Sequence, residues 1–193
     1  SEIYTYGFLS EKDLEKSKIK KELIDNAITI INPLGDEFKL MRPTTIPSMM
    51  QILAGNNNKK NQNVKLFDIS RNYKNIDNQV EKGEVPLQEN ILTIGMYGED
   101  VDFYTLKGLV EAFLDQIGIA AQRISFVEND LDTTHFHPYR SAKIMLGKDC
   151  VGLLGDIHPQ YGKNIVMAEL DFDALIDVKK SKIKFTPVSK YPS

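Results

Sequence analysis

Residues 142–154 read AKIMLGKDCVGLL, and this stretch decides the fold class. Two apolar, strand-like runs, 142–146 and 151–154, flank a short segment that begins at Gly147 and has Asp149 near its end. Glycine followed by aspartate between two such runs is typical of a tight hairpin turn. The stretch therefore predicts two neighbouring antiparallel strands.

Six further segments have the alternation, or the β-branched and aromatic composition, that is typical of strands. They are residues 3–8, 27–31, 64–69, 90–97, 124–127 and 165–170. Together with the two strands of the hairpin they predict about eight strands in all.

The clearest predicted helix covers residues 103–117, where apolar side chains recur at the three- and four-residue spacing of one buried face. Asp102 can cap the start of this helix, and Gly118 can adopt the left-handed turn at its end. Gly108 inside the helix costs about 1 kcal/mol relative to alanine. We therefore expect another segment to pack close to the backbone at Gly108.

A second helix is predicted to begin at Pro47, whose fixed φ suits a first turn, and to fade at Asn56. A short, charged helix is predicted after Ser10. Residues 55–63 and 75–84 are predicted to be exposed loops. Strands that do not alternate one-for-one with helices favour an α+β fold, an antiparallel β-sheet flanked by helices.

Composition and charge are those of an ordinary globular protein. The 193 residues, 41% of them hydrophobic and 26% charged, suit one core, so we expect a single domain over residues 1–193. The net charge of −3 disfavours a module that binds nucleic acid on its own. Cys150 is the only cysteine, which excludes an internal disulfide and a multi-cysteine zinc site. Because no apolar run approaches the ~20 residues of a membrane span, we expect a cytoplasmic protein without membrane contact.

Two histidines, His135 and His137, lie two residues apart, and on a strand they would face the same side. They could supply two metal ligands, with a third from Asp130, Asp132 or His158. Two ligands alone do not make a site, and no HExxH helix is present. A structural turn is therefore the favoured interpretation, and a metal-dependent enzyme is the alternative.

No nucleotide-binding or hydrolase motif is matched by the sequence. The glycines of residues 152–159 match neither the dinucleotide fingerprint nor the phosphate loop, and glycine within a strand more often marks a bulge. Ser141 and His158 could belong to a hydrolase triad, but no GxSxG motif surrounds any serine. Residues alone thus predict an α+β domain without a visible active site.

Several longer stretches closely resemble the β subunit of the phenylalanine–tRNA synthetases, of the bacterial type. They are NPLGDE (32–37), MRPTTIP (41–47), LFDISRNY (66–73), DFYTLKG (102–108), HPYRSA (137–142) and GLLGDIHP (152–159), in the family's order and spacing up to Tyr191-Pro192. The chain departs from the family pattern at Ser70, Asn72 and Tyr139, which affects local turns only.

The resemblance implies the catalytic-core-like domain of that subunit, with a fold like the class II synthetase core. It implies an α-subunit partner in a tetramer of two α and two β chains, which charges tRNA(Phe) with phenylalanine using ATP and magnesium. It also implies further domains on both sides. Both ends of the chain are expected to be cuts, because a strand-like run already begins at Glu2 and nothing caps residues 190–193.

The resemblance further implies that this core has lost its catalytic activity, and the residues support that expectation. An adenylation site of class II must neutralise a triphosphate with fixed cationic groups, usually arginines. The chain has four arginines and none after Arg140, whereas residues 169–175 are acidic where a late arginine is expected. Arg71 could correspond to the arginine of the second class II motif, but no acidic partner follows it.

We therefore predict no catalytic residue, no cofactor-binding residue and no metal ligand in this chain. The candidates for structural or interface roles are Arg42, Pro47, Asn56, Lys107, Gly108, Arg140, His158 and Pro159. Arg42 and Arg140 are predicted to make buried or interfacial pairs with carboxylates or carbonyls. The alternatives are a free-standing metal-dependent enzyme that uses His135 and His137, and an independent RNA-binding module.

Overall fold

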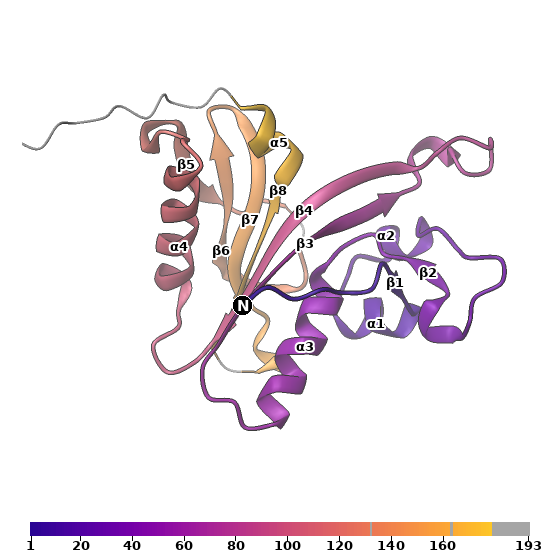
Figure 1. Cartoon of the computed structure of the whole chain (residues 1–193), viewed down its shortest axis with the longest axis horizontal. Coiled ribbons are helices and arrows are strands. Elements are labelled where there is room, and N and C mark those ends of the chain that lie inside the picture. Colours follow the sequence, from indigo (N-terminus) through magenta and orange to yellow (C-terminus); the bar gives the residue numbers. More distant parts are fainter. Residues whose placement is uncertain (132, 163, 179–193) are drawn as a thin grey trace, which may run out of the picture.

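The computed structural model of the chain describes residues 1–131, 133–162 and 164–178. Asp132, residues 190–193 and the Tyr191-Pro192 pair named above lie outside the described part of the chain. Among the described residues, six strands form one antiparallel sheet in the order β3-β4-β8-β7-β6-β5 (Figure 1). They are β3 (Val64–Lys74), β4 (Leu87–Tyr97), β5 (Ile124–Glu128), β6 (Phe136–Leu146), β7 (Asp149–Ile157) and β8 (Ile165–Asp171).

The predicted hairpin at residues 142–154 is confirmed as β6 and β7, which turn at Gly147 with a φ of +65°. The predictions for residues 64–69, 90–97, 124–127 and 165–170 are confirmed as parts of β3, β4, β5 and β8. The predicted antiparallel sheet of an α+β fold is therefore correct.

The prediction of strands at residues 3–8 and 27–31 is wrong over most of both segments. Only Phe8 belongs to a strand, the two-residue β1 (Phe8–Leu9), which pairs with β2 (Leu40–Met41). Thr29 makes an isolated bridge to Leu40. Near the N-terminus, Glu2 bridges Phe67 at the free edge of β3, so these residues cover that edge without joining the sheet as a strand.

The helices and short 3-10 turns are distributed between the strands. They are α1 (Glu11–Lys16), α2 (Lys21–Asp25), α3 (Ile46–Asn58), α4 (Phe103–Gln116) and α5 (Phe172–Asp177), with 3-10 turns at Asp36–Phe38, Ile76–Asn78, Ala121–Arg123 and Pro159–Tyr161. None of the helices in the described ranges has the length and apolarity that a membrane span requires.

Helix α4 forms where the periodicity predicts it, because both of its ends carry the expected signals. Asp102 accepts a hydrogen bond of 2.7 Å from the backbone N–H of Thr105, and Gly118 has a φ of +86°. The expectation of a close packing partner at Gly108 is wrong for the described residues, since a Cβ added there would meet no atom within 4 Å.

Helix α3 contains Pro47 in its first turn, as predicted, but it continues to Asn58. The first part of the predicted loop at residues 55–63 is therefore helical. Asn56 explains the extension in part, because its side-chain Nδ2 donates to the carbonyl of Ile52 at 2.9 Å and its Oδ1 accepts from Asn61 at 2.8 Å. Residues 75–84 are largely exposed, as expected of a loop, and contain one 3-10 turn.

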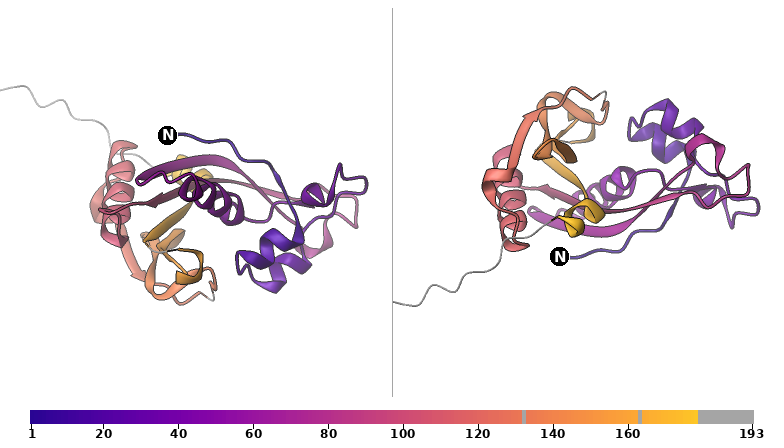
Figure 2. Two further views of the ribbon diagram at one scale, coloured as in Figure 1. Left: turned by 90° about the horizontal axis from the view of Figure 1, so that it is seen from below. Right: turned by 90° about the horizontal axis from the view of Figure 1, so that it is seen from above.

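Each face of the sheet carries its own apolar core. Helices α4 and α5 pack on the face that presents Leu92, Ile94 and Leu170, whereas α3 packs on the opposite face. Gly95 lies under α3, where a Cβ would come within 2.7 Å of the Met49 side chain and 2.9 Å of the Leu53 side chain. The two views of Figure 2 show α1 and α2 at the end of the molecule away from α4.

Candidate functional site

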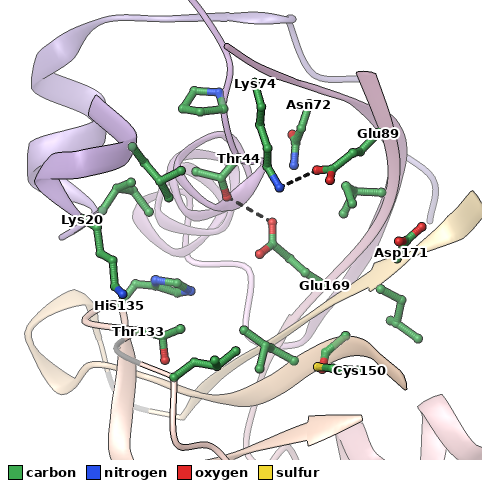
Figure 3. Close-up of a pocket in the computed structure, with 18 of the residues that line it drawn as sticks. Lys20, Thr44, Asn72, Lys74, Glu89, Thr133, His135, Cys150, Glu169 and Asp171 are labelled. Atoms are coloured by element: carbon green, nitrogen blue, oxygen red, sulfur yellow. Dashed lines mark hydrogen bonds and ion pairs between the residues drawn. The ribbon is translucent and has the colours of Figure 1, made fainter. Parts of the chain in front are cut away.

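A cavity of about 460 Å³ lies on the sheet face that carries α3. Alternation along the strands brings Asn72 and Lys74 of β3, Glu89 of β4, and Glu169 and Asp171 of β8 to this face. The loop before α3 and the segment from α1 to α2 form the facing wall (Figure 3). The polar and charged lining comprises Lys20, Thr44, Asn72, Lys74, Glu89, Thr133, His135, Cys150, Glu169 and Asp171.

Glu169 connects the floor of the cavity to the start of α3. Its Oε1 accepts hydrogen bonds from the hydroxyl of Thr45 at 2.6 Å and from the hydroxyl of Thr44 at 3.1 Å. Thr45 also shares a hydrogen bond with Thr93 of β4. Burial raises the pKa of Glu169, while the hydrogen bonds from Thr45 and Thr44 act in the opposite direction.

The lysine of the cavity is already paired. Lys74 Nζ lies 2.6 Å from Glu89 Oε2 in the neighbouring strand. Asn72 stands opposite Glu89 in the pairing of β3 with β4, on the same face as Lys74, and is 5% exposed. Its Oδ1 is buried and has no hydrogen-bond partner among the described residues. The residues of the lining therefore include one neutralised ion pair, together with a buried amide oxygen that has no partner among the described residues.

His135 lines the same cavity, and Figure 3 shows it with Lys20 on the side away from Asp171 and Cys150. Burial lowers its pKa to about 4, so the imidazole is neutral at neutral pH. Its Nε2 is buried and finds no partner within the described ranges.

The described residues do not support the metal-dependent alternative. They contain no group of three or more His, Cys, Asp or Glu side chains that could hold a metal ion. His137 instead accepts a hydrogen bond at Nδ1 from the backbone of Tyr139 at 3.2 Å, and His158 accepts one from Gln160 at 3.4 Å. Asp130 pairs with Lys143 at 2.6 Å.

The predicted pairing of Arg42 is confirmed. Arg42 is 1% exposed, its Nε donates to the carbonyl of Arg71 at 3.2 Å, and one of its terminal nitrogens lies 3.9 Å from Asp68 Oδ2. Arg140 also pairs with a carboxylate, Asp156, at 3.2 Å. Its side chain is 66% exposed, so this pair is not buried within the chain, and an interfacial position of Arg140 stays a prediction.

The other candidates have local structural contacts. Lys107 pairs with Glu111 at 2.6 Å and its Nζ lies 4.7 Å from the centroid of the Phe126 ring. The backbone N–H of His158 donates to the carbonyl of His135 at 2.9 Å, and Pro159 begins a 3-10 turn. None of the eight structural or interface candidates is among the described residues that line the cavity.

Arg71 does not face the cavity. Its guanidinium bonds to Gln88 Oε1 at 3.0 Å and to Asn90 Oδ1 at 3.4 Å, on the opposite face of the sheet from Asn72 and Lys74. The possible correspondence of Arg71 to the arginine of the second class II motif, against which the missing acidic partner already spoke, therefore has no geometric support either. Lys74, three residues later, is the basic side chain of β3 that lines the cavity.

The sequence did not predict this cavity: of its lining, only His135 was considered as a functional candidate, and then as a metal ligand. The predicted strand ended at residue 69, so its alternation was not followed to Asn72 and Lys74. Extending the period-two pattern from Asp68 would have separated these two residues from Arg71. No local signal marks Thr44 or Glu89, because their roles depend on contacts with distant strands.

Comparisons with known proteins agree with the fold and with the resemblance. The family model of the phenylalanyl tRNA synthetase beta chain CLM domain matches residues 1–172. The phenylalanine–tRNA ligase beta subunits of Clostridium acetobutylicum and Clostridium tetani are 35% and 36% identical over 100% and 98% of the chain. The chain spans 24% of the length of each of these relatives.

A solved structure of a pyrrolysyl tRNA synthetase, PylSc from Desulfitobacterium hafniense, has a TM-score of 0.68 at 12% identity. The likeness covers 91% of this chain and 59% of that one, and it shows a shared class II fold. Because the family model covers most of the sequence, the chain belongs to the family of phenylalanyl-tRNA synthetase beta chain CLM domains, a part of that tRNA ligase.

Proposed function

We propose that this chain is the non-catalytic, core-like module of the phenylalanine–tRNA ligase β subunit. In this proposal it supports assembly with a catalytic α subunit, in a cytoplasmic tetramer of two α and two β chains. The whole assembly charges tRNA(Phe) with phenylalanine by using ATP and magnesium. The module itself supplies no group that reacts with ATP.

The ion pair between Lys74 and Glu89 is the observation that carries the proposal. A triphosphate and a developing pentavalent phosphorus need fixed cationic groups that are free to meet them. The charged lining of the cavity is Lys20, Lys74, Glu89, Glu169 and Asp171, in which carboxyl groups outnumber lysines. No arginine lines the cavity within the described ranges, so the residues present do not fit ATP.

Exposed apolar side chains support a role in assembly. Ile31 and Leu34 are 93% and 96% exposed, and nearby Tyr6 and Phe8 stack edge-to-face on Phe38 at 5.9 and 6.3 Å. Exposed apolar groups of this kind are more typical of surfaces that meet a partner than of a free monomer. The interface roles of Asn56, Lys107, Gly108, Arg140, His158 and Pro159 are part of the same proposal.

The catalytic part of the proposal is tested with Lys74→Ala in the β subunit of the assembled enzyme. We expect kcat for aminoacylation to stay within about twofold of the parent, whereas loss of a cationic group at a reacting phosphate costs about 10²-fold or more. The chain alone, mixed with ATP and phenylalanine, is expected to give no pyrophosphate exchange. Exchange without the α chain would refute the proposal.

The assembly part is tested by hydrogen exchange on the full-length β subunit, alone and with its α subunit. We expect the α subunit to slow amide exchange at a surface within residues 1–178. If the α subunit binds but leaves every amide of this module unprotected, the module does not support assembly.

A further inference from the structure

The cavity has the size and lining of a small-molecule site. Its volume of about 460 Å³ lies within the ~300–1,000 Å³ range of ligand pockets, which are mostly apolar with a few polar groups. The apolar side chains of the lining are those of Ile19, Leu23, Pro43, Ile91, Leu131 and Leu153. An apolar body could therefore be buried against these walls.

The polar groups of the cavity define what such a ligand must carry. The hydroxyls of Thr44 and Thr45 already donate to Glu169, and Lys74 is already paired with Glu89. The carboxyl group of Glu169 can still accept further hydrogen bonds. Both threonine bonds end on Oε1 of Glu169, so neither of them occupies its second oxygen, Oε2. A complementary ligand must therefore bring hydrogen-bond donors.

The charges lead to the same conclusion independently. Once Lys74 is paired with Glu89, Lys20 is the one further lysine or arginine that the described residues contribute to the lining, beside the carboxyl groups of Glu169 and Asp171. Glu169 belongs to β8 and Lys20 precedes α2, across the cavity in Figure 3. A positively charged donor is thus favoured over an anion at the Glu169 end.

We propose that the cavity binds a small organic cation, a primary ammonium group on an apolar body, with the ammonium at Glu169. A metal ion would not use the apolar walls, and the described residues offer no three-ligand cluster. The proposal does not depend on the assembly role proposed above, because a module without catalytic groups can still hold a ligand. It assigns a ligand-binding role to the sheet face that carries α3, for which the proposed function names no catalytic group.

The test uses two probes with the same body and opposite charge, 2-phenylethylamine and 3-phenylpropionate. Each is titrated into the ¹⁵N-labelled chain of 193 residues and followed by amide chemical shifts. We expect the amine to shift the amides of Thr44, Asn72 and Glu169 with a Kd of about 1 mM or below. The acid is expected to bind at least about tenfold more weakly.

Glu169→Gln is the diagnostic variant and Glu128→Gln is its matched control. Glutamine keeps an oxygen that can accept from both threonines, but it removes the charge that holds the ammonium. We expect affinity for the amine to fall about tenfold or more in Glu169→Gln and to stay unchanged in Glu128→Gln, which lies on β5 outside the cavity. Amide spectra of each variant establish that it is folded.

Two results would overturn the proposal without relying on any variant. One is the absence of shifts at the cavity amides with the amine at about 10 mM, far above the expected Kd. The other is equal binding of the amine and the acid, which would mean that only the apolar walls are recognised. Neither result would affect the pyrophosphate-exchange test of the proposed function.

Discussion

Thr45 donates a hydrogen bond of 2.6 Å to Glu169, a residue 124 positions later in the chain. Thr44 donates to the same oxygen, and its own Oγ1 accepts from the backbone N–H of Ile46 at 3.2 Å. The start of α3 is thus fixed to β8 through one carboxyl group. The same carboxyl group forms the polar end of the cavity, so the position of the helix and the chemistry of the cavity are coupled.

Glu169→Gln should stabilise the fold at neutral pH. Burial raises the pKa of Glu169 above its ordinary value of 4.5, so the folded state holds its proton more tightly than the unfolded state. Its stabilising contribution is complete below that ordinary value and is lost as the pH rises through the folded-state pKa. We expect the free energy of unfolding at pH 7 to rise in this variant, as measured by urea denaturation.

The gain from Glu169→Gln should shrink as the pH is lowered, because protonated glutamic acid and glutamine are then both neutral. A gain that is equally large below the ordinary pKa of the carboxyl would show that its origin is not the charge. Glu128→Gln serves as the control that should leave the free energy of unfolding unchanged at every pH.

Arg42→Ala should destabilise the fold by about 3 kcal/mol, because it leaves Asp68 buried without its cation and removes a donor to Arg71. Urea denaturation measures the loss. The matched control is Arg140→Ala, which breaks an exposed pair and should cost no more than about 1 kcal/mol. Equal losses in the two variants would contradict the assigned structural role of Arg42.

Two glycine-to-alanine substitutions should have opposite effects. Gly95→Ala places a methyl group against Met49 and Leu53 and should cost about 1–3 kcal/mol through overpacking. Gly108→Ala meets open space within the described chain and should gain about 0.5–1 kcal/mol through helix propensity. Thermal unfolding gives both values. A destabilised Gly108→Ala variant would mean that α4 tolerates no side chain at this position.

His135 should make the fold sensitive to mild acid. Its pKa falls to about 4 on folding, from an ordinary value of 6.5, so the folded state binds fewer protons between these two values. Its contribution to the free energy of unfolding is complete above 6.5 and is lost as the pH falls through about 4. We expect His135→Gln to flatten the pH dependence of stability in this window.

An NMR titration of the imidazole protons tests the cause directly. The His135 resonance should move with a midpoint near pH 4. A midpoint near 6.5 would show that the ring is solvated and would remove the reason for the acid sensitivity.

Much of the fold could be predicted from the sequence where local signals agree. Helix α4 has a capping aspartate, a periodic apolar face and a glycine at its end, and the hairpin of β6 and β7 has an alternating pattern around Gly147. The two wrong strand predictions concern residues 3–8 and 27–31. Their composition is typical of strands, but a strand also needs a neighbouring strand with which it can pair. Those segments find only isolated bridges and the two-residue β1.

The cavity could not be predicted in the same way. Its lining comes from segments between Ile19 and Asp171 that only the sheet order brings together. Arg71 was considered as a phosphate-binding residue because of its charge. Side chains alternate between the two faces of a strand, however, and this alternation places Lys74, and not Arg71, in the cavity. The burial that shifts the pKa of Glu169 and of His135 is likewise a tertiary property.

The pair of Lys74 with Glu89 also bears on the evolution of this domain. A single substitution that removed the carboxylate of Glu89 would release one cation, but Glu169 and Asp171 would still face an incoming phosphate. A substitution of either of those carboxyl groups alone would leave the lysine engaged. No single one of these substitutions would therefore leave a free lysine without a facing carboxyl group, so turning this cavity into an anion site would require at least two substitutions together.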